Sequence, residues 1–178
     1  MDNATDILEI ICRQAAQGNN EARTALYNRF SKRMFGICIR MTGSRQDAED
    51  ILQDSFVRAF RHINQLKHAG SFESWLRRIV INACILHARQ AVRWQHITES
   101  IEEIPEEETH PWGDIPAELI QEEINVLPEG CREIFNLYAI ENLSHQEVAR
   151  LLGISVSTSK SQYHRARQLL KERLQPLL

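Results

Sequence analysis

A run of hydroxyl, basic and imidazole side chains near the C-terminus could bind DNA. These residues fall on one side of a helix predicted from Ser155 onward: Ser157, Thr158, Lys160, Ser161, His164, Arg165 and Arg167. Hydroxyl groups exchange hydrogen bonds with base edges, and Lys and Arg neutralise phosphates, so this pattern is typical of a helix that lies in the major groove. The alternative is an ordinary amphipathic helix whose polar side faces water.

The preceding residues favour DNA binding. Ser144 can cap a short helix with Val148, Leu151 and Leu152 on one side, and Gly153 then permits a tight turn. Ser155 can cap the second helix, whose inward stripe is predicted to be Val156, Ser159, Tyr163, Ala166, Leu170 and Leu174. This order predicts a helix-turn-helix. Ser159 falls where such motifs usually bury an aliphatic side chain, so the second helix is expected to pack less firmly there or to lean on Tyr163.

Charge is distributed unevenly along the 178 residues, although the formal net charge is only −3. Residues 61–93 carry six Lys and Arg against one acidic residue, and residues 131–178 carry seven against four. Residues 94–130 carry eleven acidic residues and no Lys or Arg. Two separate basic regions predict two contacts with nucleic acid.

Motifs for metal binding and catalysis are missing from the sequence. The seven His residues form no H-E-x-x-H pattern, and the chain has no clustered Cys/His spacing and no Gly-rich phosphate loop. The four Cys residues lie far apart on predicted apolar helix faces, which predicts buried thiols. We therefore expect no enzymatic activity, no cofactor and no metal site. Without a long apolar run or a signal-like N-terminus, we also expect a cytoplasmic protein with no membrane insertion.

The periodicity of the first 93 residues predicts an all-α bundle of four helices. The first is predicted to begin at a Thr5 cap, the second at an Asn20 cap and the third at a Ser44 cap. The fourth is predicted to follow a Ser71 cap and to turn Phe72, Trp75, Leu76, Ile79 and Ala83 inward. Trp75 is therefore expected in the core rather than at the surface.

A segment rich in Glu and Pro separates this bundle from a second helical domain. Residues 94–117 are predicted to be an acidic, extended and mobile linker. Pro116 and Pro128 can each open a helix before the helix-turn-helix, which gives a second small domain over residues 118–178. The acidic run Glu106 to Glu108 could also fold onto the basic C-terminal helix and mask it.

Taken together, these segments resemble bacterial RNA polymerase sigma factors of the extracytoplasmic-function (ECF) type within the sigma-70 family. QDAEDILQDSFVRAF (46–60) is similar to the polymerase-binding signature, and FESWLRRIVINACILHAR (72–89) is similar to the segment that opens and reads the minus-ten element. LPEGCREIF (127–135) and KSQYHRAR (160–167) resemble the domain that reads the minus-thirty-five element. The resemblance covers nearly the whole chain in the right order.

The resemblance also implies roles for particular residues. The residues implied to contact core polymerase, at the β′ clamp, are Asp47, Asp50, Gln53, Asp54 and Phe56. Those implied to bind the minus-ten element, partly by capturing a flipped-out base, are Asn64, Lys67, His68, Ser71, Phe72, Arg77, Arg78, Asn82 and Arg89. The helix predicted from Ser155 would contact the minus-thirty-five element. In the recognition helix, Ser157, Ser159 and Gln162 replace the glycine, valine and arginine usual in the family.

The implied function is that of a sigma initiation factor, which binds core RNA polymerase at the β′ clamp and β flap and directs it to promoter DNA. An anti-sigma factor is implied as a further partner. Three other interpretations remain open at this point. They are a helix-turn-helix regulator that binds DNA without polymerase, an enzyme, and an adaptor whose helix-turn-helix is degenerate. Autonomous binding to a palindromic site would favour the first of these.

Overall fold

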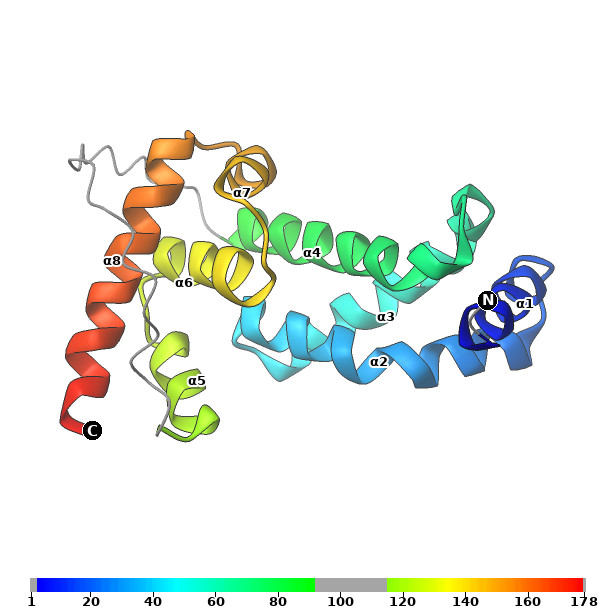
Figure 1. Ribbon diagram of the computed structural model, residues 1–178, viewed down its shortest axis with the longest axis horizontal. Coiled ribbons are helices and arrows are strands. Elements are labelled where there is room, and N and C mark those ends of the chain that lie inside the picture. Colours follow the sequence, from blue (N-terminus) through cyan, green and yellow to red (C-terminus); the bar gives the residue numbers. More distant parts are fainter. Residues whose placement is uncertain (1–2, 92–114, 178) are drawn as a thin grey trace. The chain divides into compact units, whose positions relative to one another are not determined.

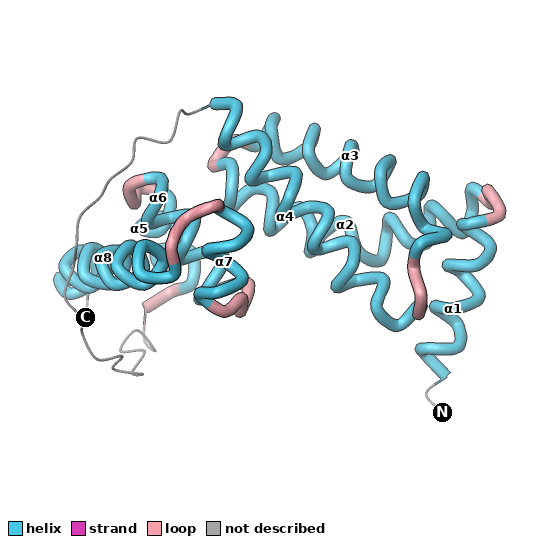
Figure 2. Tube along the Cα trace, turned by 90° about the horizontal axis from the view of Figure 1, so that it is seen from above, coloured by secondary structure: helices cyan, strands magenta, loops and turns pink. Residues whose placement is uncertain are grey.

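The computed structural model describes residues 3–91 and 115–177, and its helices are labelled in Figure 1. The chain divides into two compact units, unit 1 (Met1–Arg93) and unit 2 (Trp94–Leu178). Across the described ranges the regular structure is helical throughout, without a strand (Figure 2). The all-α prediction is therefore confirmed.

Unit 1 is a bundle of four helices: α1 (Asn3–Ala16), α2 (Asn20–Thr42), α3 (Arg45–His62) and α4 (Phe72–Ala91). The long helix α2 contacts all three others, and α3 also packs against α4. Two short 3-10 turns, η1 (Ile63–Gln65) and η2 (Ala69–Ser71), lie between α3 and α4. Helix α1 packs against both turns, so it supports the loop that joins α3 to α4.

Local capping explains where these helices begin and end. The Asn19 side chain accepts a hydrogen bond from the backbone N–H of Ala22, and Ser44 does the same for Asp47. Gly43 closes α2 in the left-handed conformation, at φ 67°. Two predicted capping positions differ from the structure by one or more residues. Asn19 rather than Asn20 caps α2, and Thr5 lies inside α1, which already begins at Asn3.

The buried side of α4 differs from the prediction. Phe72 and Leu76 are fully buried as expected, but the stripe continues through Val80, Ile81, Cys84 and Ile85. Trp75, Ile79 and Ala83 are only half-buried. The core stripe is thus rotated around the helix, because α2 and α3 cover α4 from a direction that periodicity alone does not give.

Unit 2 contains α5 (Ala117–Asn125), α6 (Glu129–Phe135), α7 (His145–Leu152) and α8 (Val156–Leu174). A π turn, η3 (Asn136–Ile140), continues α6, and a short 3-10 turn, η4 (Gln175–Leu177), follows α8. The core lies against α8, whose Ala166, Leu170 and Leu174 are fully buried. Pro116 and Pro128 immediately precede α5 and α6, as predicted.

Part of the predicted linker belongs to this core. Ile115 is 8% exposed and packs in the same cluster as Ile124 and Leu127. The acidic segment therefore ends before Ile115 and not at residue 117. The rest of the predicted linker, with Glu106 to Glu108, lies outside the described residues.

All four cysteines are buried with free thiols, which confirms the sequence prediction. Burial raises the pKa of Cys12 to about 11, with the positive charge of Arg29 opposing the shift. Burial likewise raises the pKa of Cys131. By contrast, a hydrogen bond from Cys84 lowers the pKa of Cys38.

We expect iodoacetamide to alkylate Cys12 slowly in the native protein. Because the thiolate is the nucleophile, raising the pKa from 9.0 to about 11 lowers the reactive fraction at neutral pH roughly a hundredfold. The rate should recover as the pH rises toward 11 and should match that of an ordinary thiol in denaturant. Peptide mass spectrometry after timed quenching measures this. Rapid labelling of Cys12 at pH 7 in folded protein would contradict it.

Candidate polymerase and DNA interfaces

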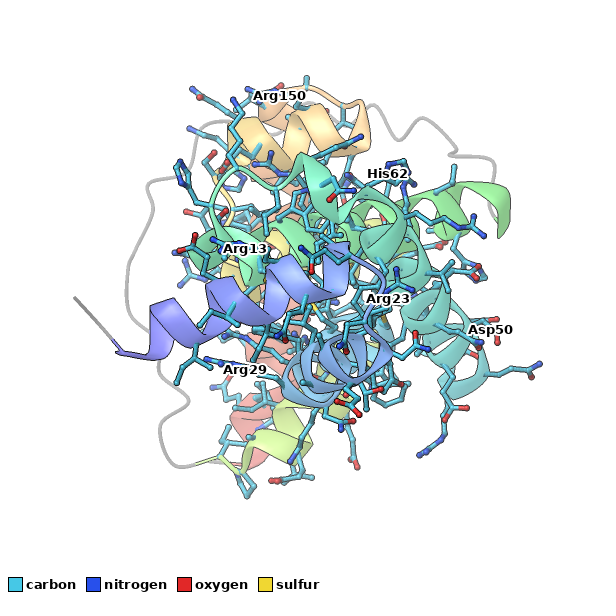
Figure 3. The ribbon with its side chains drawn as sticks, turned by 90° about the vertical axis from the view of Figure 1, so that its right-hand side faces the viewer. Arg13, Arg23, Arg29, Asp50, His62 and Arg150 are labelled. Atoms are coloured by element: carbon cyan, nitrogen blue, oxygen red, sulfur yellow. The ribbon has the colours of Figure 1, made fainter. Side chains whose placement is uncertain are left out.

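The predicted polymerase-binding residues of α3 lie largely on one exposed surface. Asp50, Gln53 and Asp54 are exposed at three- and four-residue spacing, and Figure 3 shows Asp50 projecting outward from α3. Asp47 is half-buried near the helix start, with its Oδ2 3.6 Å from Nε2 of His87. These residues give α3 an anionic surface that a basic partner helix could contact.

Phe56 does not belong to this surface. Its side chain is 3% exposed and packs with the rings of Tyr27 and Phe60, with centroids at 4.8 and 5.8 Å. Phe56 is therefore a core residue, and the prediction that it faces the polymerase is corrected. The apolar groups that are exposed beside it are Tyr27 and Val57, at 41% and 42%. Sequence reasoning missed them because neither lies on a predicted apolar stripe.

The loop between α3 and α4 presents the polar groups expected to capture a base. Asn64, Lys67, His68 and Ser71 are all exposed. The Ser71 hydroxyl donates a 2.6 Å hydrogen bond to the backbone carbonyl of His68, which closes the turn η2. Ile63 is buried and anchors the start of the loop. The loop is thus held in shape by turns at both of its ends.

Phe72 is the second correction. Its side chain is fully buried, with its ring centroid 5.3 Å from that of Phe30. It therefore serves as a core anchor at the start of α4 and not as a stacking surface beside the loop. Trp75, whose ring centroid lies 6.0 Å from that of Phe72, is half-buried and offers the aromatic surface nearest to this position in the sequence.

The remaining predicted minus-ten residues lie along α4. Arg78 and Asn82 are exposed, and Arg77 is half-buried. Near the start of the helix, Arg33 of α2 forms an ion pair with Glu73. The side chain of Arg89 lies outside the described part of the chain. Exposed cationic and amide groups on one helix can contact phosphates and bases.

Helices α7 and α8 form the predicted helix-turn-helix. Ser144 and Glu147 make a reciprocal capping box at the start of α7, and Gly153 ends the helix at φ 70°. Ser155 caps α8, since its hydroxyl accepts from the N–H of Thr158 at 2.9 Å. The same hydroxyl lies 2.7 Å from Ser157 Oγ and 2.8 Å from Thr158 Oγ1. The hydroxyl groups at the start of α8 are therefore pre-organised.

Three of the seven predicted DNA-contacting side chains on α8 are exposed and the other four are half-buried. Ser157, Lys160 and Arg165 are exposed, whereas Thr158, Ser161, His164 and Arg167 are half-buried. The Ser161 hydroxyl donates to the carbonyl of Thr158 at 3.1 Å. The Nε2 atom of His164 is buried and lacks a hydrogen-bond partner among the described residues. That nitrogen therefore does not lie at the surface of α8.

Ser159 lies on the inward side of α8, as predicted, and is fully buried. Its hydroxyl and Nδ1 of His145 share a 2.9 Å hydrogen bond. The Ser159 side chain thus has a polar partner in α7, which the sequence did not indicate. Val156, predicted to point inward, is 39% exposed.

Residues 3–91 and 115–177 contain neither a cluster of metal-binding side chains nor a membrane-spanning helix. Within this part of the chain, three or more His, Cys, Asp or Glu side chains nowhere gather closely enough to hold a metal ion. Of the helices described, none combines the length and apolar character needed to cross a membrane.

Both units match models of known protein families. The model of sigma-70 region 2 matches residues 26–93, and that of sigma-70 region 4 matches residues 117–170. These two ranges contain the acidic surface of α3, the α3–α4 loop, α4, α7 and α8 as far as residue 170. Each candidate interface therefore falls largely inside a region that matches a sigma-70 family model.

Individual proteins show the same relationship. The chain is 32% identical to the ECF RNA polymerase sigma factor SigE of Mycolicibacterium smegmatis, over 84% of this chain and 60% of that protein. It is 28% identical to the ECF sigma factor SigW of Bacillus subtilis, over 93% of this chain and 95% of that one. Among solved structures, CnrH in complex with the cytosolic domain of CnrY has a TM-score of 0.54 and 25% identity, covering 94% of this chain and 96% of CnrH. Together with the two region matches, these similarities place the chain in the sigma-70 family, among the RNA polymerase sigma factors of the ECF type.

Proposed function

We propose that this protein is a transcription initiation factor that binds core RNA polymerase and directs it to promoters with minus-thirty-five and minus-ten elements. The observation that carries the proposal is the division of surfaces between two sigma-type regions. Unit 1 presents an anionic helix and a polar loop next to a basic helix, while unit 2 presents a capped recognition helix. A sigma factor needs all of these surfaces, whereas an autonomous regulator needs only the recognition helix of unit 2.

In unit 1, the exposed acidic and amide groups of α3 would bind a basic surface of the polymerase β′ clamp. Charge complementarity of this kind supplies specificity and a fast association rate. Next to this helix, the loop residues Asn64, Lys67 and His68 would hold an unpaired base of the minus-ten element. Arg78 and Asn82 of α4 would contact the same strand. Capture of an extruded base compensates for its unstacking, which costs a few kcal/mol.

In unit 2, α8 would enter the major groove of the minus-thirty-five element. Ser157, Thr158 and Ser161 would exchange hydrogen bonds with base edges, and Lys160, Arg165 and Arg167 would contact phosphates. Binding through several phosphates makes affinity fall steeply with salt. The half-buried His164 would contribute less than the exposed residues, because its Nε2 is enclosed.

Binding partners and site of action follow from this function. The required partners would be core polymerase, bound at its β′ clamp and β flap, and promoter DNA. The protein would act in the cytoplasm, where both partners are found. We further propose regulation by an anti-sigma protein that covers these surfaces. CnrH, which matches 94% of this chain, was solved in complex with the cytosolic domain of another protein, CnrY. Initiation factors of this family use binding energy and not catalysis to open DNA.

Reconstitution with purified core polymerase tests the proposal. The protein should co-elute with core enzyme in size-exclusion chromatography, and the complex should give discrete run-off transcripts on sheared genomic DNA. Core enzyme alone is the control. Failure to associate with core enzyme, combined with tight binding of the protein alone to a palindromic duplex, would instead establish an autonomous DNA-binding regulator.

A further inference from the structure

A buried polar contact joins the two helices of the helix-turn-helix. Nδ1 of His145, the first residue of α7, and Oγ of Ser159 in α8 share a hydrogen bond of 2.9 Å. His145 is 8% exposed and Ser159 is fully buried. Because water cannot easily replace either partner, separating the Ser159 hydroxyl from Nδ1 of His145 would cost free energy.

Aromatic rings fix the direction of this contact. The His145 imidazole stacks on Tyr138 of η3, with centroids 4.0 Å apart and planes 12° from parallel. Tyr163 of α8 meets the same ring edge-on at 5.7 Å and packs on Tyr138 at 4.5 Å. Contacts from η3 and α8 therefore fix the plane of the His145 imidazole. Because Nδ1 lies in that plane, they also fix the direction of its hydrogen bond to Ser159.

The contact lies directly behind the proposed reading surface of α8. Ser159 occupies the inward side of the same turns whose outward side carries Ser157, Thr158 and Ser161. Apolar packing is non-directional and tolerates small slides of a helix, whereas a hydrogen bond weakens steeply when its geometry is lost. A rotation of α8 large enough to move its outward side chains to other base edges would break this hydrogen bond.

A second polar contact lies one turn further along α8. The Cys131 thiol of α6 donates to Oε1 of Gln162 at 3.1 Å. Ser159 and Gln162 thus tie α8 to two different elements at adjacent turns. Two such contacts restrict both the rotation and the slide of the helix.

We propose that the His145–Ser159 hydrogen bond is a positioning contact that sets which bases α8 discriminates. Neither residue touches DNA in this account; they act by holding the outward hydroxyl groups in one orientation. The inference rests on the proposed function, since it concerns how the holoenzyme selects its minus-thirty-five element. The competing explanation is that the pair only fills and stabilises the core of unit 2.

Three variants separate these explanations. Ser159→Ala removes the hydroxyl with little change in side-chain volume and takes this hydrogen-bond partner from Nδ1 of His145. The double variant His145→Phe with Ser159→Ala removes both polar groups of the pair but keeps an aromatic ring for the stack on Tyr138, so it should recover much of the stability lost in the single variant. Thr24→Val, which removes an exposed hydroxyl from α2, is the control.

The measurement is the binding of reconstituted holoenzyme to two duplexes at one salt concentration. One carries the upstream element of a promoter mapped with the wild-type holoenzyme, and the other is a scrambled duplex of equal composition. Thermal unfolding of each free variant is recorded in parallel. The specificity ratio is the affinity for the promoter duplex divided by the affinity for the scrambled duplex. We expect this ratio to fall about tenfold in both the single and the double variant, while the affinity for the scrambled duplex stays unchanged. Thr24→Val should retain the wild-type ratio.

The double variant makes the test decisive even if Ser159→Ala alone folds poorly. A double variant that regains stability but still discriminates poorly would support a positioning role. A double variant with both wild-type stability and wild-type discrimination would overturn it, because the pair would then be structural only. If the wild-type holoenzyme itself gave no discrete promoters, the proposed function would fail, a result distinguishable from an unchanged ratio in the variants.

Discussion

Reversing the charges of Asp50 and Asp54 to lysine should abolish stable association with core RNA polymerase. The two carboxylates are exposed one turn apart on α3, so both can face the same partner helix. A lysine at each position would replace two attractions by two repulsions. Close charge pairs across interfaces couple by about 1.5–7 kcal/mol, so a loss of about 4 kcal/mol, or a thousandfold in Kd, is a conservative expectation.

The control for this experiment is Glu21→Lys. Glu21 is an exposed carboxylate in the first turn of α2, and its reversal changes the net charge in the same direction. Fluorescence anisotropy of labelled protein titrated with core enzyme gives Kd for each variant. The prediction also requires that the doubly reversed protein unfold at close to the wild-type temperature, since neither side chain is buried. Equal losses in the variant and the control would point to a general charge effect and remove α3 as the interface.

Replacing Asn64, Lys67 and His68 by alanine should prevent promoter opening while leaving polymerase binding intact. All three side chains are exposed on the loop between α3 and α4, where they are available to an extruded base. Contacts that hold an unstacked base contribute about 1–3 kcal/mol per base, so the yield of open complex should fall about ten- to a hundredfold. The loop itself should keep its shape, because Ile63 anchors it and the bond from Ser71 to His68 uses a backbone carbonyl.

Permanganate reactivity of unpaired thymines in the minus-ten element measures this opening. Lys32→Ala, which removes one exposed positive charge from α2, is the control for a change in net charge. A template already unpaired across the minus-ten element should restore much of the transcription, because the cost of unstacking no longer has to be met. If the triple variant opened duplex promoters as well as the wild type, the loop would not be the site of base capture.

The exposed polar residues of α3 were predicted more reliably than the two phenylalanines assigned to interfaces. Asp50, Gln53 and Asp54 lie on the exposed side of α3, as their pattern indicated. Phe56 and Phe72 were assigned to interfaces because the motifs around them suggested it, yet both are buried. Each belongs to an aromatic contact with α2, through Tyr27 and Phe30 respectively. The apolar periodicity of α4 already turned Phe72 inward, so its assignment to the DNA interface came from the family resemblance and not from the local pattern.

The sequence by itself determined the helices, their principal caps and the order of the functional surfaces. Ser44, Ser144 and Ser155 cap their helices through side chains, and Gly43 and Gly153 end theirs in the left-handed conformation. Capping and hydrophobic periodicity act over a few residues, so they can be read without knowledge of the fold.

Tertiary structure alone decided what lies beneath those surfaces. The packing of α2 and α3 on α4 leaves Val80 and not Trp75 fully buried, and Ile115 packs in the core of unit 2. It also gave Ser159 a hydrogen-bond partner fourteen residues away, in His145. Each outcome depends on which elements pack together and from which direction. A buried polar residue can be satisfied only by a neighbour that the completed fold supplies.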